Sequence, residues 1–445
     1  MLLELLEGTV STSANRLALV SPERTWTYAE LGNVIEERAK ELVGTEVEPG
    51  RVHVIDAHPD SNAVIEILGC WRAGVPVAPL DPRLTPAEKS RAKAVLDRSE
   101  TDARAILWTS GTGGRPRGVV LTLENICASA DAVIDRLSLG TKDVWLLSLS
   151  PAHVGGMALM TRAFLLGCTL FAYGPFRADL ASQLIDGEGL PEGASPVTHM
   201  SLVPTQLLHL LKHRGEMRVP TWFRCGLIGG AHAPPDLIKQ GLAGGWPLAL
   251  TYGMTEMTSQ VATAVPSEVT RKPGSVGRAL MGTEIKIDSE GQILVKGPTL
   301  APGYIGSAEP LADGEGWYRT GDLGHFDDDG DLWVTGRRSD RIVSGGITID
   351  ANRIEDVLCE HEGVQDACVV GIPDPEWGEI VGAWVVPISH GLDLRLLEEY
   401  TRQSLGEAKR PRIWLAREDI PRNTNGKLER SRVREALELE ARQAD

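Results

Sequence analysis

The residues best suited to chemistry lie in a segment rich in glycine and hydroxyl side chains, Trp108 to Val120. Its polar and glycine residues are Thr109, Ser110, Gly111, Thr112, Gly113, Gly114, Arg115, Arg117 and Gly118. Glycines allow backbone N–H groups to approach phosphates, hydroxyls add donors, and the two arginines add positive charge. The Gly-Lys-Ser/Thr ending of a Walker A loop is absent. Taken alone, the segment leaves phosphate binding and an ordinary turn open as alternatives.

Four further segments place polar side chains at turns or strand ends. The run Tyr252-Gly253-Met254-Thr255-Glu256 combines an aromatic ring, a hydroxyl and a carboxylate after an apolar strand. Asp322 lies in a glycine-flanked predicted turn, Arg337 lies near a suspected domain boundary, and Lys427 follows a turn near the end of the chain. Each segment alone is compatible with ordinary loop chemistry and, for Lys427, with a solvated side chain. Their occurrence together, in this order, favours one composite site.

The overall composition restricts the classes of partner. The 445 residues include 45 Lys plus Arg and 61 Asp plus Glu, a formal net charge of −16, which argues against nucleic acid or an anionic membrane as the main partner. No apolar run approaches the ~18 residues of a membrane span, so a cytoplasmic location is expected. The six cysteines form no CxxC pair, which is unlike a disulfide framework or a zinc cluster.

The elements that must position these motifs follow an α/β pattern as far as about Gly274. Strands are predicted at 52–55, 75–80, 105–108, 144–147, 169–172 and 226–228, and a helix at 62–73. This alternation is typical of α/β units around a parallel sheet. Open sheets of this kind bind ligands at the loops that follow their strands.

The pattern changes after Gly274. Short strands predicted at 284–287, 292–295 and 332–334 indicate a small β subdomain. The acidic run 327–331 lacks the ligand spacing and closing glutamate of an EF-hand, so a hairpin turn is predicted there. After Arg341, helices at 352–360 and 392–405 accompany strands at 367–371 and 381–387, which predicts a compact domain of about 100 residues.

With these motifs the sequence resembles the adenylate-forming superfamily of acyl- and aryl-CoA synthetases, luciferases and the adenylation domains of peptide synthetases. The resemblance extends from the segment 25–31 to Lys427. It implies an α/β fold with a large N-terminal domain of α/β layers plus a small β subdomain, residues 1–338, which binds ATP and an acid. It also implies a small mobile C-terminal α+β domain, residues 339–445, which rotates about a hinge at or next to Ser339 between two half-reactions.

The resemblance implies a role for each motif. The loop from Thr109 to Gly118 would hold the β- and γ-phosphates of ATP, with Arg117 where the family usually has lysine. The adenine site would consist of Gly229, Gly230, Ala231 and Tyr252, with Gly253 and Met254 beside it. Thr255 would bind the α-phosphate, and Glu256 would ligate Mg²⁺.

The remaining implied roles concern the ribose, the adenylation step and CoA. Asp322 would accept hydrogen bonds from the ribose hydroxyls, with Arg337 beside it, and Lys427 would be the mobile lysine of adenylation. When a carboxylate attacks phosphorus, a lysine that bridges the two anions lowers the barrier, and Mg²⁺ disperses charge on the leaving pyrophosphate. The path of CoA, the co-substrate, would be lined by Ser344, Gly345 and Gly346.

Within the superfamily, the segments 146–156, 201–207 and 254–263 are most similar to the o-succinylbenzoate-CoA ligases of menaquinone biosynthesis. Their acid keeps one aromatic carboxylate while its aliphatic carboxylate reacts, so its pocket must offer polar or cationic partners to a spectator anion. The candidate residues are His153, Arg162, His199, Thr205, Gln206, Ser259 and Gln260. Three of them also have a stated alternative: His153 as a gate to the pocket, Arg162 as a solvated helix residue, and Gln206 as a helix cap.

Other functions stay open at this point. A general aryl- or medium-chain acyl-CoA synthetase would use the same mechanism on another acid. A stand-alone adenylation enzyme would load a carrier protein, although no carrier domain is fused. A catalytically silent nucleotide-binding scaffold would not need Glu256, Asp322, Arg337 and Lys427 together. A homodimer is implied by the resemblance alone.

Overall fold

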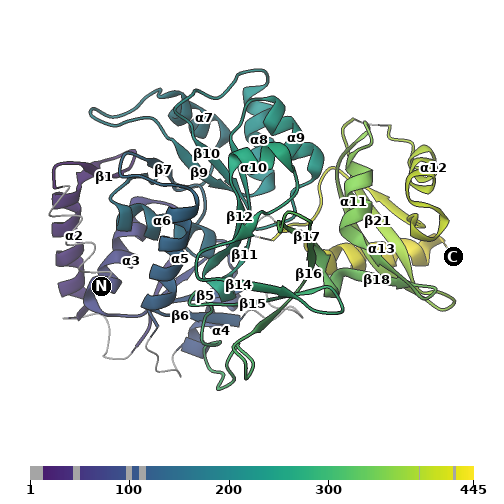
Figure 1. The fold of residues 1–445 in the computed structure, drawn as a ribbon, viewed down its shortest axis with the longest axis horizontal. Coiled ribbons are helices and arrows are strands. Elements are labelled where there is room, and N and C mark those ends of the chain that lie inside the picture. Colours follow the sequence, from purple (N-terminus) through teal and green to yellow (C-terminus); the bar gives the residue numbers. More distant parts are fainter. Residues whose placement is uncertain are drawn as a thin grey trace.

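The computed structural model describes residues 14–43, 51–96, 103–109, 117–389, 391–423 and 427–444. Within these residues the strands form four sheets. Three of them build the large part of the molecule, and the fourth lies in a smaller part beside β16 and β17 (Figure 1). The predicted mixture of α/β layers, a β subdomain and a C-terminal α+β unit is confirmed.

The largest sheet has nine strands and a parallel centre. In spatial order they are β13 (Arg278–Ala279), β12 (Ser259–Ala264), β11 (Leu248–Met254), β10 (Cys225–Ile228), β9 (His199–Leu202), β7 (Val144–Leu146), β8 (Thr169–Phe171), β1 (Leu17–Val20) and β2 (Thr25–Thr27). The strands from β11 to β1 run parallel, and the outer ones are antiparallel.

Both faces of this sheet are covered, as expected for parallel strands. Trp145 of β7 packs into one core, whereas its neighbours Val144 and Leu146 pack into another on the opposite face. The first core includes residues of α5 (Leu123–Arg136) and α6 (Val154–Leu166). The second core includes residues of α7 (Ala178–Asp186), α8 (Pro204–Arg214), α9 (Pro235–Ala243) and α10 (Pro266–Arg271).

A second sheet of four strands carries the glycine-rich segment. Its strands are β3 (His53–Asp56), β4 (Val77–Leu80), β5 (Ala105–Thr109) and β6 (Arg117–Leu121), with α2 (Tyr28–Glu41), α3 (Ser61–Ala73) and α4 (Pro86–Leu96) nearby in the sequence. Thr109 ends β5 and pairs with Arg117, which begins the antiparallel β6. The ends of the segment are therefore fixed by a strand pair, while 110–116 lie outside the described residues.

The predicted β subdomain is an antiparallel sheet of β14 (Glu284–Ile287), β15 (Gln292–Lys296), β16 (Tyr318–Phe326) and β17 (Leu332–Arg337). The predicted turn around Asp322 is wrong, because Asp322 lies within β16 and pairs with Arg337. The acidic run forms the predicted turn between β16 and β17. The ammonium of Lys272 lies 2.7, 2.7 and 2.8 Å from carboxylate oxygens of Asp327, Asp329 and Asp331, so a lysine takes the place a cation would have.

The C-terminal sheet has five strands: β18 (Arg341–Ser344), β19 (Ile347–Asp350), β20 (Val364–Asp374), β21 (Gly378–Pro387) and β22 (Ile413–Ala416). The helices α11 (Ala351–Cys359), α12 (Leu394–Leu405) and α13 (Arg430–Ala444) pack against it. A short 3₁₀ turn at Arg338–Asp340 links this sheet to β17. Ser339, the predicted hinge, lies in that turn.

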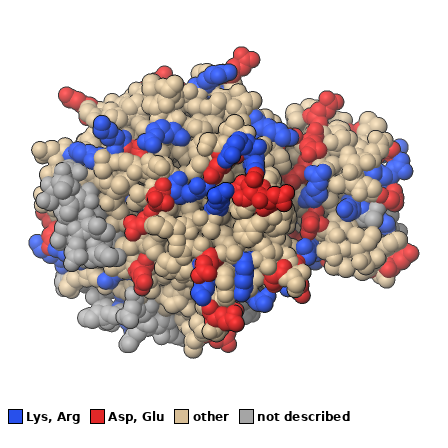
Figure 2. All heavy atoms as spheres, in the orientation of Figure 1, with Lys and Arg blue, Asp and Glu red and all other residues tan. Residues whose placement is uncertain are grey.

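The distribution of charged side chains on the surface and the state of the cysteines can be compared with the composition. Acidic and basic side chains are interspersed on the face shown in Figure 2. Among the described residues, no helix is long and apolar enough to cross a membrane. The six cysteines, all within the described residues, form no disulfide, and five of them are buried.

Candidate active site

The end of β11 places Glu256 at the centre of the site. The strand leads into a short 3₁₀ helix, Thr255–Met257, and the chain then passes through Thr258 and Ser259 with φ of 51° and 117°. Backbone held in these rarely occupied regions is typical of functional sites. At Gly253, a Cβ would lie 1.9 Å from the Ser259 carbonyl oxygen, so only glycine permits this approach of the two strands.

The carboxylate of Glu256 has the surroundings of a cation ligand. It is 9% exposed and accepts a hydrogen bond of 2.9 Å from the Tyr304 hydroxyl. Among the described residues it has no lysine, arginine or histidine at ion-pair distance. A buried carboxylate without a counter-charge is costly unless a cation joins it. Glu256 therefore fits the role of a ligand to Mg²⁺, which prefers carboxylate oxygens.

Asp322 is held by two neighbours. Its Oδ2 accepts a hydrogen bond of 2.8 Å from Tyr252, and its Oδ1 lies 2.9 Å from Nε of the half-exposed Arg337. Burial and the charge of Asp322 raise the pKa of Tyr252 well above its ordinary value, so its hydroxyl stays a donor. A carboxylate has about four lone-pair sites, so Asp322 retains capacity for further donors such as ribose hydroxyls.

Lys427 joins this cluster from the C-terminal part. It follows residues 424–426, which lie outside the described residues, and Asn423 holds it through two hydrogen bonds of 2.8 and 3.0 Å. Burial lowers the pKa of Lys427, as does the charge of Arg337, while Asp322 and Glu256 act in the opposite direction. The ammonium therefore interacts with the same acids that surround the predicted nucleotide site.

The nucleotide loops are only partly described. Ser110, Gly111, Thr112, Gly113, Gly114 and Arg115 lie outside the described residues, whereas Thr109, Arg117 and Gly118 lie on the paired strands β5 and β6. Gly229, Gly230 and Ala231 follow β10, at the carboxyl end of the parallel sheet next to β11. Ligands of open α/β sheets bind at this edge.

Two of the candidate acid-binding residues, Gln206 and Gln260, already form hydrogen bonds within the protein. Gln206 caps α8, because its Oε1 accepts from the Val203 N–H at 3.0 Å and its amide donates to the Ser148 carbonyl at 2.9 Å. The Gln260 amide oxygen accepts from Thr251 and Thr263 within the sheet. Ser259 is buried, and Thr205 is half-buried in the first turn of α8. Gln206 therefore takes the structural role that was its alternative.

His153 is fixed by a residue that sequence reasoning missed. Its Nε2 lies 2.8 Å from Oδ2 of Asp81, which follows β4. Burial disfavours the charge on Asp81, but hydrogen bonds from His153 and Arg83 outweigh it and hold the pKa of that carboxyl well below its usual range. Asp81 and Arg83 follow a strand of the second sheet, a position that a search for polar residues after strands would find.

Arg162 is the most unusual of the candidates. It is 2% exposed, so the alternative of a solvated helix residue is wrong. Its guanidinium lies 4.6 Å from the Trp145 ring centre, and Nη2 donates to the Ser201 hydroxyl at 2.9 Å, while Nε has no partner. Burial lowers the pKa of Arg162 to about 10, and among the described residues no carboxylate pairs with it. His199 stacks on Trp145, and burial with nearby cations lowers its pKa to about 3, so it is neutral.

A small cavity lies between α5, α6 and the start of β12. It is lined by Leu121, Ile126, Ser129, Ala130, Val154, Met157, Ala158, Thr161 and Thr258. Thr258 follows the 3₁₀ helix of Glu256, and Val154 follows His153. The cavity therefore has mostly apolar walls, and two of its lining residues are within two positions of Glu256 or His153 in the sequence.

The predicted CoA residues lie elsewhere in this domain orientation. Ser344 pairs with Gly378, and the Gly345 N–H donates to the Trp377 carbonyl at 2.9 Å. Gly345 and Gly346 form a turn with φ of 56° and 81° between β18 and β19. These contacts are internal to the C-terminal part, so the structure does not bring the three residues to Glu256.

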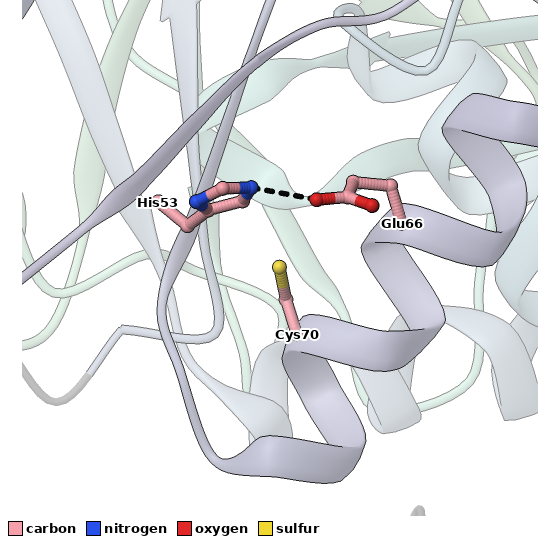
Figure 3. A group of neighbouring side chains, drawn as sticks. All are labelled: His53, Glu66 and Cys70. Carbon is pink, nitrogen blue, oxygen red and sulfur yellow. Dashed lines mark hydrogen bonds and ion pairs between the residues drawn. The ribbon is translucent and has the colours of Figure 1, made fainter. Parts of the chain in front are cut away.

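A second group of polar side chains lies away from this site. His53, Glu66 and Cys70 approach one another between β3 and α3 (Figure 3). Glu66 accepts from His53 at 2.6 Å and from Arg38 through two bonds of 2.7 Å. Burial disfavours the charged carboxylate, but these bonds outweigh it and lower its pKa. Because Arg38 already neutralises Glu66, we interpret the group as a structural link between α2, α3 and β3.

Comparison with known proteins supports the resemblance. The model of the AMP-binding enzyme family matches residues 6–101 and 87–305, and that of the AMP-binding enzyme C-terminal domain matches residues 353–427. The 2-succinylbenzoate–CoA ligase of Geobacillus sp. (strain WCH70) is 36% identical over 348 residues, which are 76% of this chain and 69% of that protein.

Solved structures of Bacillus subtilis o-succinylbenzoate CoA synthetase (MenE) have the same fold at 28% identity. The complex with the acyl-adenylate intermediate OSB-AMP has a TM-score of 0.87 and covers 96% of this chain and 97% of that chain. The complex with ATP and magnesium ion has a TM-score of 0.85, with 96% and 98% covered. A double mutant bound with the product analogue OSB-NCoA has a TM-score of 0.69 at 28% identity, with 97% of this chain and 98% of that chain covered. This structure therefore fits the acyl-adenylate complex better than the product-analogue complex.

The motif order, the fold and these matches agree, and the resemblance to adenylate-forming enzymes is confirmed. The two family models together match most of the chain, and they include the segments of Glu256 and Lys427. The chain therefore belongs to the AMP-binding enzyme family.

Proposed function

We propose that this chain is an ATP- and Mg²⁺-dependent ligase that activates a carboxylic acid as an acyl-adenylate and transfers it to CoA, with 2-succinylbenzoate as the acid. The observation that carries the proposal is that the charges of Arg337, Asp322 and Glu256 act on Lys427 across the two parts of the chain. The named relatives and the MenE complexes support the choice of acid. Formation of 2-succinylbenzoyl-CoA is a step of menaquinone biosynthesis.

In the first half-reaction, an oxygen of the acid attacks the α-phosphorus of ATP, and the bond to pyrophosphate breaks. Lys427 stabilises the negative charge shared by the incoming carboxylate and the phosphate, and Thr255 donates to the α-phosphate. Asp322 holds the ribose, and the backbone at 229–231 and 252–254 encloses the base. Glu256 would hold Mg²⁺, which would compensate the charge of the leaving pyrophosphate.

In the second half-reaction, the CoA thiolate attacks the acyl carbonyl, and AMP leaves. We propose that the chain divides into domains at 338/339 and that rotation at Ser339 moves Lys427 away and brings Ser344, Gly345 and Gly346 to the site. The present contacts of Ser344 and Gly345 within the C-terminal part are consistent with an enzyme poised for adenylation. Domain rotation of this kind separates the two chemistries in time.

The acid pocket must accommodate the spectator carboxylate. We assign that role to Arg162, because a buried cation without a counter-charge is stabilised when an anion binds beside it. The Ser201 hydroxyl lies next to the same guanidinium. His153, fixed by Asp81, precedes Val154, which lines the cavity. A long-chain fatty acid would need a deep apolar tunnel instead.

The test is pyrophosphate release with Mg·ATP from a panel of acids: 2-succinylbenzoate, benzoate, octanoate and 4-coumarate, each with and without CoA. We expect turnover of 2-succinylbenzoate alone, which Lys427→Ala abolishes. The matched control is Lys239→Ala, which removes an exposed lysine that pairs with Asp236. If another acid reacts, the ligase chemistry stands and the acid is wrong. If Mg·ATP binds but no acid in a wider panel reacts, the silent scaffold is supported.

Two finer proposals concern setting and assembly. We propose a cytoplasmic location, where ATP and CoA are available, which fractionation with an antibody to the chain would test. We also propose a homodimer, which light scattering after size-exclusion chromatography would test. Nothing else in the proposed mechanism depends on the dimer, because the residues named above come from one chain.

A further inference from the structure

A short segment, residues 301–305, connects two parts of the proposed nucleotide site, the backbone of Glu256 and strand β6. At one end the Ala301 N–H donates to the backbone carbonyl of Glu256 at 2.8 Å. At the other end Tyr304 bridges to Val119, and the Val120 N–H donates to the Gly303 carbonyl at 3.1 Å. The segment 301–305 is thus attached both to the proposed metal ligand and to β6, the strand that follows the proposed phosphate loop.

The side chain of Tyr304 repeats this connection. Its hydroxyl donates to Glu256 Oε1 at 2.9 Å, and its ring lies 4.0 Å from the guanidinium carbon of Arg117. Arg117 is the first residue of β6 and the residue that stands where the family usually has lysine. A guanidinium, being planar, stacks on an aromatic ring in a way that an ammonium does not.

Tyr304 is the donor in its hydrogen bond with Glu256. A protonated phenol uses its single proton on Oε1 and leaves Oε2 of Glu256 available to a cation. Hydrogen bonds of this kind orient a ligating carboxylate and tune its affinity for metal.

We propose that Tyr304 is a positioning residue that orients the Glu256 carboxylate for Mg²⁺ and ties it to the phosphate loop through Arg117. The inference rests on the proposed function for the roles of Glu256 and the loop. It assigns no chemistry to Tyr304 itself. It predicts that the metal and the triphosphate are bound by one connected unit rather than by two independent loops.

The test measures nucleotide binding by calorimetry, with Mg·ATP and with ATP in EDTA. Tyr304→Phe removes the hydroxyl and keeps the ring under Arg117. We expect it to weaken Mg·ATP binding by roughly 10–100-fold and to leave metal-free ATP binding unchanged. Tyr304→Leu also removes the ring, and it should weaken both. The matched control is Tyr400→Phe, since Tyr400 packs on His361 in the C-terminal part.

The outcomes separate this inference from the proposed function. If Tyr304→Phe weakens the binding of Mg·ATP and of metal-free ATP equally, or weakens neither, the proposed role of Tyr304 toward Mg²⁺ is wrong. If Tyr304→Leu binds metal-free ATP as tightly as Tyr304→Phe does, the proposed link through Arg117 is wrong. Wild-type protein that binds Mg·ATP no better than ATP overturns the inference altogether. Wild-type protein that binds Mg·ATP but does not react with 2-succinylbenzoate contradicts the proposed acid and leaves the binding comparison valid.

Discussion

The imidazole Nε2 of His232 lies 2.8 Å from Oδ1 of Asp356, and this ion pair joins the loop after β10 to helix α11 of the C-terminal part. Burial lowers the pKa of His232, but the hydrogen bond and charge of Asp356, with the charge of Glu355, outweigh it, and Arg430 opposes them weakly. The net pKa of His232 is raised. The contact therefore stabilises this domain orientation most when the imidazole is protonated.

The first prediction follows from the sign of that shift. The stabilisation is fully present below the ordinary histidine pKa of about 6.5 and is lost as the pH rises through the raised pKa of His232. Asp356→Asn should lower the pKa of His232, which a pH titration of the histidine ring signals by NMR would measure. The signal of the exposed His58 serves as the control. An unchanged pKa of His232 in Asp356→Asn would contradict the prediction.

The second prediction concerns the specificity of the acid pocket. Arg162→Met keeps the volume and removes the charge, so the KM for 2-succinylbenzoate should rise by about 10–100-fold, the loss of a charged hydrogen bond. The comparison acid is 4-phenyl-4-oxobutanoate, which lacks the spectator carboxylate and whose KM should change little. Steady-state kinetics with both acids measure the ratio. An equal loss for the two acids would show that Arg162 acts on packing alone.

The third prediction tests the close approach at Gly253. Gly253→Ala would place a methyl group against the Ser259 carbonyl, so the strands before and after Glu256 must separate. We expect the free energy of unfolding in urea to fall by about 1–3 kcal/mol. Adenylation should fall as well, because Thr255 and Glu256 lie between the two strands. Gly140→Ala is the control, since its Cβ would meet no atom within 4 Å; equal effects of the two changes would refute the argument.

The fourth prediction concerns the three carboxylates around Lys272. The lysine holds the pKa of Asp327 well below its usual range, so the stabilisation is present above the ordinary aspartate pKa and is lost in acid. Lys272→Gln removes the lysine from Asp327, Asp329 and Asp331 and leaves Asp331 only its longer ion pair with Arg278, so Tm should fall. Added Ca²⁺ should restore Tm in the variant and leave the wild type unchanged. Recovery in neither protein would mean that the geometry is specific for an ammonium.

The sequence predicts the elements best where the pattern is local. The strand at 284–287 is found with the predicted bounds, and the helix predicted at 62–73 begins one residue earlier, because apolar periodicity identifies both. Asp322 shows the limit. Its flanking glycines are typical of a turn, but pairing with Arg337 on β17 makes the segment a strand, and a pairing between distant segments leaves no local pattern.

The site shows the same division. Motif order singles out Glu256, Asp322 and Lys427, and the charges of the two acids act on Lys427 in the structure. Their roles stay predictions. Tyr304 could not be singled out, because it acts through Glu256, a partner distant in the chain, and a tyrosine after a Pro-Gly dipeptide is a weak signal. Asp81 was missed, although its place after a strand is a signal that the sequence contains; its partner His153 is distant in the chain.

The ion pair of Asp322 and Arg337 has a consequence for the lifetime of the product of the first reaction. Both residues belong to strands that precede Ser339, so a rotation there would carry Lys427 away and leave this pair in place. The adenylate is a mixed anhydride that water can hydrolyse. The nucleotide part of the adenylate would stay bound during the rotation, so little of the activated acid would dissociate before the CoA thiol reacts with it.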